Sequence, residues 1–99
     1  MKAVDKSSLA RWRTIDAASC IAALADYAKA DTNFVPRKDK HSTRWHVNVN
    51  GQDFELLCTG PKFWDTRAHR GGGGAIDLAM HLFGLDFKQA VAILVARSV

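Results

Sequence analysis

The residues best suited to binding chemistry are basic and aromatic side chains gathered in the middle of the chain. Residues 32–70 hold seven basic and four acidic side chains, whereas residues 71–99 hold two of each. Phosphates bind to such cations and unpaired bases stack on aromatic rings, so this pattern predicts binding of single-stranded nucleic acid. A first cluster comprises Arg37, Lys38, Lys40, His41 and Arg44. A second comprises Lys62, Trp64, Arg67, His69 and Arg70. The same composition also suits a solvated basic face with aromatic residues in the core.

Four consecutive glycines, at positions 71–74, follow the second cluster and precede an apolar helical pattern. Glycines let backbone N–H groups converge, and a helix N-terminus attracts anions, so Gly72 and Gly73 are candidate phosphate contacts. The segment is not a P-loop, because no Gly-Lys-Ser/Thr follows it. Nor is it a Rossmann fingerprint, because a parallel βαβ unit is missing from the pattern. Alternatively, the glycines only let the chain turn sharply into the helix, and Asp77 complements the helix dipole.

Catalytic and metal chemistry are weakly indicated. Asp53, Glu55 and Asp65 could gather near His46, but alternating acidic residues on strands more often form a wet outer face. We therefore predict no catalytic residue and no enzyme. Cys20 and Cys58 are too few for a disulfide scaffold or a Cys₄ zinc site, and we interpret both as small buried hydrophobic residues.

Length and composition indicate one globular domain. The chain has 99 residues, 47% apolar and 24% charged, with a net charge of +4. This composition excludes a disordered tail. No apolar run approaches the roughly 18 residues of a membrane span, and the N-terminus lacks the apolar stretch of a secretory signal. We therefore expect a cytoplasmic protein without membrane contact.

The hydrophobic periods predict an α+β fold. Residues 1–13 are expected to be a flexible basic arm, docking at most through Leu9 and Trp12, and residues 14–99 a single domain. A helix is predicted over residues 16–29 from apolar residues at i, i+3, i+4 and i+7. Residues 31–43 form a polar connection. Two further helices are predicted, over residues 75–83 and from residue 87 onward. Gly84 ends the first, and Asp86 with Gln89 forms a capping box for the second, which buries Phe87.

Three strands are predicted between these helices. Trp45, Val47 and Val49 alternate with polar residues, and Asn50-Gly51 is a strong signal for a type I′ hairpin turn. The return strand covers residues 52–58, and a third covers residues 63–65 after the turn at Gly60-Pro61. The expected sheet is a three-stranded antiparallel meander packed with one N-terminal and two C-terminal helices.

The second half of the chain resembles a known family. The similarity runs through Lys-Phe-Trp-Asp at 62–65, Gly-Gly-Gly-Ala-Ile-Asp-Leu at 72–78 and His-Leu-Phe-Gly-Leu-Asp-Phe-Lys-Gln-Ala-Val at 81–91. It resembles the end of the zinc-ribbon domain of DNA primases from bacteria, phages and plasmids. That family has a strand, Cys-x-x-Cys, glycines, an Ile-Asp-Phe-like helix start and then Gly-Leu-(Ser/Asp)-Phe-x-x-Ala-Val. With the hairpin and the upstream helix, the resemblance extends over residues 17–96.

The zinc ligands of that family are missing here. The resemblance places Thr66 and His69 at one ligand pair, and Lys38 and His41 at the other. Two histidines fall short of the four ligands of a structural zinc site, so we predict no metal and no cofactor. Packing of Trp45, Phe63 and Trp64 is expected to replace the metal.

In the primases the chemistry belongs to another domain, so the resemblance implies a binding role. The prediction is a module that binds single-stranded DNA in the replication or transfer of a plasmid, phage or other mobile element. The alternative is an adaptor that docks on a replication or conjugation protein, such as a helicase, polymerase or relaxase. An exposed tryptophan beside Arg67 and Arg70 would favour nucleic acid. Buried rings and an apolar patch elsewhere would favour the adaptor.

Overall fold

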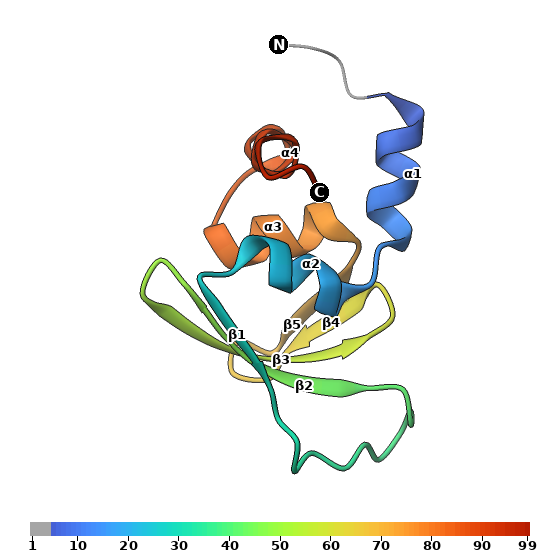
Figure 1. Cartoon of the computed structure of the whole chain (residues 1–99), viewed down its shortest axis with the longest axis vertical. Helices are drawn as coiled ribbons and strands as arrows, with labels where there is room; N and C mark the ends of the chain where they lie inside the picture. Colours follow the sequence, from blue (N-terminus) through green and yellow to red (C-terminus); the bar gives the residue numbers. More distant parts are fainter. Residues whose placement is uncertain (1–4) are drawn as a thin grey trace.

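The computed structural model describes residues 5–99, and Figure 1 shows their arrangement. The helices are α1 (Lys6–Thr14), α2 (Ala17–Leu24), α3 (Ala75–Phe83) and α4 (Phe87–Ala96). The strands are β1 (Tyr27–Ala30), β2 (Thr43–Val49), β3 (Gln52–Thr59), β4 (Lys62–Asp65) and β5 (Arg70–Gly73).

All described strands form one antiparallel sheet in the order β1-β2-β3-β4-β5. The predicted α+β class is confirmed. The three predicted strands are the central ones, but within residues 5–99 the meander has five strands rather than three. Asn50 and Gly51 have φ values of 52° and 81°, and Val49 pairs with Gln52, so the predicted two-residue turn joins β2 and β3.

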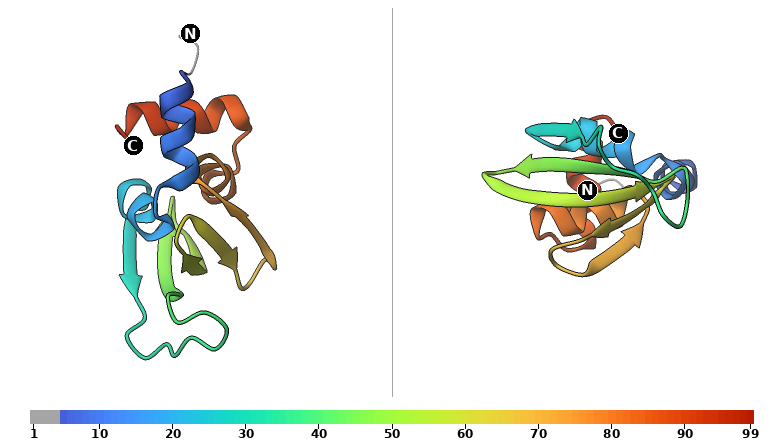
Figure 2. Two further views of the ribbon diagram at one scale, coloured as in Figure 1. Left: turned by 90° about the vertical axis from the view of Figure 1, so that its right-hand side faces the viewer. Right: turned by 90° about the horizontal axis from the view of Figure 1, so that it is seen from below.

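The helices of the described chain lie on one side of the sheet, and α2 and α3 cover that face (Figures 1 and 2). Buried apolar side chains on that face pack against α2 and α3, and α4 lies over α3 on the side away from the sheet. The sheet contributes Val47, Val49, Phe54, Leu56, Cys58 and Phe63. The helices contribute Cys20, Ile21, Leu24, Leu78, Ala79 and Leu82. The alternating residues of each strand point to the opposite face, called here the outer face.

The predicted helix over residues 16–29 is wrong over residues 25–29. The helix ends at Leu24, although Ile21 and Leu24 are buried as expected. The Asp26 N–H donates to the Asn48 carbonyl, and its carboxylate accepts the Asn50 N–H at 2.8 Å. These bonds begin the pairing of β1 with β2, so tertiary pairing overrides the helical tendency of the alanines.

The prediction of a flexible arm over residues 1–13 is also corrected. Residues 1–4 lie outside the described residues, but α1 begins directly after them, capped by the Asp5 carboxylate. Trp12 is buried, and its indole N–H donates to the Val99 carbonyl at 3.0 Å. Gly74 has a φ of 92°, and a Cβ there would lie 3.0 Å from the Trp12 carbonyl oxygen. Glycine at that position lets α1 approach the junction between β5 and α3.

The helix α3 has the predicted boundaries, and α4 begins where predicted. Gly84 ends α3 in the left-handed conformation, and Asp86 and Gln89 form both bonds of the capping box at α4. Phe87 departs from its prediction, because 52% of its surface is exposed. Among the described helices, no single one has the length and apolar composition of a membrane span. Taken together, α3 and α4 have that length and composition, but the pair is bent by 103°.

Candidate nucleic-acid interface

A groove of about 700 Å³ lies on the outer face, between β3, β4 and the segment that connects β1 to β2. We call it the outer groove, and we call residues 31–42 the wall segment. Leu57 and Trp64 contribute from the sheet, and Phe34, Val35 and Pro36 contribute from the wall segment. Arg37, Lys38 and Lys62 also line it. In Figure 1 the wall segment extends below the sheet, on the side away from the helices.

Trp64 gives the outer groove an exposed aromatic surface. The residue is 44% exposed, and Gly71 is its cross-strand partner on β5. A Cβ at Gly71 would lie 2.8 Å from Trp64 Cε3 and 2.5 Å from the Phe63 carbonyl oxygen. The indole ring therefore lies against the backbone of β5, and glycine is required there for it to do so.

We predict that Gly71→Ala lowers the free energy of unfolding by about 1–3 kcal/mol, because the new methyl group overlaps backbone and indole atoms. It should also shift the tryptophan fluorescence maximum. Gly73→Ala is the matched control, since its Cβ would meet nothing closer than Lys62 Cγ at 3.9 Å. Urea titration of the three proteins measures the difference. Equal stability of both variants would contradict this placement of the indole.

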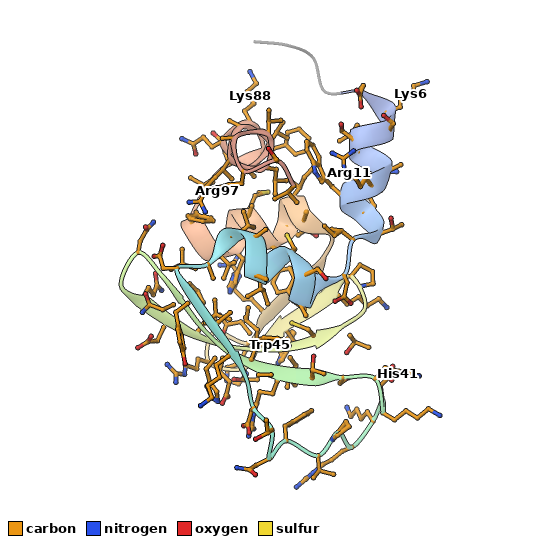
Figure 3. All side chains as sticks on the ribbon, in the orientation of Figure 1. Lys6, Arg11, His41, Trp45, Lys88 and Arg97 are labelled. Atoms are coloured by element: carbon orange, nitrogen blue, oxygen red, sulfur yellow. The ribbon has the colours of Figure 1, made fainter. Side chains whose placement is uncertain are left out.

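The predicted clusters are rearranged in the structure. Lys62, at the start of β4, joins Arg37 and Lys38 in the outer groove rather than the second cluster. Arg67 and His69 lie at the other end of β4, in the turn over residues 66–69, and Arg70 begins β5. Lys40 and His41 are exposed, and His41 lies where the wall segment approaches β2 (Figure 3).

Arg44, predicted as a nucleic-acid contact, is engaged within the protein. Its Nε donates to Asp31 Oδ2 at 2.9 Å, and its Nη2 donates to the same oxygen. The guanidinium carbon lies 5.1 Å from the Phe34 ring centroid. The pKa of Asp31 is lowered, chiefly by the hydrogen bond from Arg44.

Three of the four consecutive glycines, expected to bind a phosphate or to turn the chain into the helix, instead lie in a strand, β5. Gly72 of β5 pairs with Phe63 of β4, and the Gly73 N–H donates to Asp77 Oδ2 at 3.1 Å. The protein's own carboxylate therefore occupies the position at which a bound phosphate was expected. The nucleic-acid contacts predicted at Gly72 and Gly73 receive no support from this geometry.

A buried hydrogen-bonded pair, Asp65 of β4 and His81 of α3, lies between the sheet and the helices. Asp65 is 3% exposed, and its Oδ2 is 2.6 Å from His81 Nε2. Its Oδ1 accepts the N–H groups of Arg67 and Ala68, both at 2.9 Å, and so holds the turn over residues 66–69. Burial alone would raise the pKa of Asp65. The bonds from the turn amides and from His81 outweigh burial, so this pKa lies below its ordinary value.

The rings of Phe54 and Phe63 pack on His81, with centroid distances of 5.7 Å and 5.6 Å. His81 is therefore held between two aromatic rings and Asp65 in the core. His46, suggested as the neighbour of Asp65, instead lies 3.7 Å from Asp31.

The expected metal-ligand positions have other roles. The Thr66 hydroxyl donates to Glu55, and His69 is exposed with a φ of 55°. Within residues 5–99, no three His, Cys, Asp or Glu side chains gather as metal ligands would. Cys20 and Cys58 are free and buried, as interpreted from the sequence, and burial raises their pKa values to about 11 and about 12.

Of the expected packing residues, Phe63 is buried and Trp45 half-buried against the core, whereas Trp64 is exposed. Sequence reasoning missed the apolar contributors to the groove. Leu57 was available as a signal, because a leucine at a polar position of an alternating strand marks an apolar patch on the outer face. The wall residues Phe34, Val35 and Pro36 gave no comparable signal, because the sequence of a connecting segment seldom shows which surface it packs against.

Comparisons with known proteins give one partial similarity. No protein-family model matches the chain, and no solved structure matches it. Over 44 residues the chain is 48% identical to a "65 kDa protein" of Zymomonas mobilis subsp. mobilis. The match covers 44% of this chain and 8% of that protein, so the chain spans only a small part of its length.

Proposed function

We propose that this chain binds single-stranded DNA in the outer groove. The observation that carries the proposal is the exposed Trp64 ring in a groove lined by Arg37, Lys38 and Lys62. An unpaired base stacks on the indole, and the adjoining phosphates bind to the cations. Duplex DNA does not fit this mode, because its bases are already stacked on one another.

The charge and shape of the groove support the same proposal. Three cations and one carboxylate, Asp39, line it, so its net charge suits an anionic ligand. Leu57, Val35 and Pro36 supply apolar surface for the base and sugar. Such a surface binds with little sequence preference, because every base offers a π face.

The biological setting is proposed from the resemblance to the primase zinc-ribbon domains. In this role the module holds template or transferred single strands during replication or transfer of a plasmid, phage or other mobile element. It supplies binding rather than catalysis, and it needs no zinc because the turn over residues 66–69 is held by Asp65.

The adaptor alternative has one observation in its favour. A groove of about 370 Å³ lies between α1, α3 and α4, with Leu9, Met80 and the exposed Phe87 among its lining. A partner protein seated there would bury apolar surface, and its binding would depend little on salt. Salt dependence therefore separates the two functions.

A salt titration of a fluorescently labelled oligothymidylate tests the proposed function. With the groove's three cations each neutralising one phosphate, log K should fall against log salt with a slope of about −2, at about −0.7 per contact. Lys62→Ala should weaken binding and make the slope about 0.7 less steep. Lys88→Ala, on α4 far from the groove (Figure 3), should change neither.

Two outcomes would count against this site. Loss of binding in Arg67→Ala/Arg70→Ala with normal binding in Lys62→Ala would move the interface to the other end of β4. If the native protein does not bind the oligothymidylate at low salt, the DNA-binding function is rejected and the adaptor function remains.

A further inference from the structure

We propose that Arg44 is a positioning residue that fixes one wall of the outer groove and does not itself contact DNA. The proposal rests on the proposed function and deepens it. It assigns to Arg44 a role opposite to the one its charge suggests.

The wall segment is anchored at its start by Asp31. One oxygen of Asp31 accepts both bonds from Arg44, and the other accepts the Asn33 N–H at 2.9 Å. The Phe34 N–H donates to the Asp31 carbonyl at 3.3 Å. Asp31 therefore links Arg44 to the turn from which the groove-lining residues emerge.

The far end of the wall segment is anchored separately. The Ser42 and Thr59 hydroxyls are 2.6 Å apart and hydrogen-bonded. The residues that line the groove, 34–39, lie between these anchors. The Asp31 N–H also donates to the Arg44 carbonyl at 2.8 Å, so loss of the side-chain bonds would loosen this end of the wall and leave its backbone link to β2 in place.

The surroundings of Arg44 leave it poorly placed to bind phosphate. Its guanidinium bonds Asp31, has Glu55 Oε1 at 3.9 Å and lies against the Phe34 ring. Two carboxylates thus oppose its charge. Asp31 takes the Nε–H and one Nη2–H, so a phosphate could reach only the remaining N–H groups of a side chain whose charge is already opposed.

Two substitutions separate positioning from direct contact. If Arg44 positions the wall, Arg44→Ala should weaken oligothymidylate binding about tenfold with the salt slope unchanged. Arg44→Lys should bind the oligothymidylate nearly as weakly as Arg44→Ala does, because lysine keeps the charge but has neither the planar guanidinium nor its contact with the Phe34 ring. If Arg44 instead binds phosphate, Arg44→Lys should bind normally and Arg44→Ala should lose about 0.7 of the slope.

Asp31→Asn tests the same contact independently, by changing the carboxylate that accepts the bonds from Arg44. This change removes the opposing charge and releases Arg44 while keeping an oxygen for the Asn33 N–H. A positioning role predicts weaker binding. Stronger binding with a steeper slope would show that Arg44 is a phosphate contact and would overturn the proposal.

Amide hydrogen exchange without DNA distinguishes failure of this inference from failure of the proposed function. The Asn33 and Phe34 amides should exchange faster in Arg44→Ala and Arg44→Lys than in the native protein, while the amides of β3 remain protected. Unchanged exchange at Asn33 and Phe34 would overturn the positioning role whether or not DNA binds. Absence of DNA binding by the native protein would reject only the proposed function.

Discussion

Asp65→Asn is expected to lower the free energy of unfolding by about 3 kcal/mol, a large share of a small domain's stability. The change leaves His81 without its anionic partner in a site enclosed by Phe54 and Phe63. Urea titration near neutral pH measures the loss. Asp53→Asn is the matched control, because Asp53 is exposed and its bond to Asn48 lies at the surface, so its effect should stay within about 0.5 kcal/mol. Equal losses in both variants would contradict a special role for the buried pair.

The contact between Asp65 and His81 also predicts how the free energy of unfolding depends on pH. The folded-state pKa of Asp65 lies below its ordinary value, so the ionised carboxylate stabilises the fold at pH values above about 4. That stabilisation is lost as the pH falls through the lowered pKa. The stability difference between the native protein and Asp65→Asn should therefore shrink below about pH 4. A difference that stays constant from neutral to strongly acidic pH would show that the charge of Asp65 contributes nothing.

Local sequence signals predicted the centre of the fold well. The Asn50-Gly51 turn, the alternation around Val47 and the capping residues at Asp86 each act within a few residues. Such signals depend on backbone preferences that neighbouring residues satisfy. The β2–β3 hairpin and the starts of the two C-terminal helices can therefore be located from the sequence alone.

The two edges of the sheet escaped prediction for physical reasons. The residues of β1 continue an alanine-rich pattern that locally favours helix, and only pairing with β2 makes them a strand. The glycines of β5 have no side chains and so no alternation to read. They form a strand because Gly71 accommodates the Trp64 ring and because β4 supplies a partner.

The candidate site was predicted in its residue types but not in its arrangement. Lys62 and Trp64 lie in the outer groove, yet Arg44 is paired with Asp31, thirteen positions away. Asp65 likewise pairs with His81 across sixteen positions. A sequence pattern shows which charges exist, whereas the pairing of distant charges decides which of them remain available to a ligand.

Trp64→Ala is expected to weaken single-stranded DNA binding by about 10- to 100-fold, since one base stacked on an aromatic ring contributes about 1–3 kcal/mol. The salt slope should not change, because no cation is removed. Trp64→Phe should recover most of the affinity by restoring a flat ring. Tyr27→Ala is the matched control: Tyr27 is an exposed aromatic residue of the same face, 57% exposed, but lies on β1 outside the outer groove. Fluorescence anisotropy at one low salt concentration gives all four affinities. If Tyr27→Ala loses as much affinity as Trp64→Ala, stacking is not confined to the groove. If Trp64→Ala binds like the native protein, base stacking on β4 is excluded, and the groove's cations alone must account for whatever binding is seen.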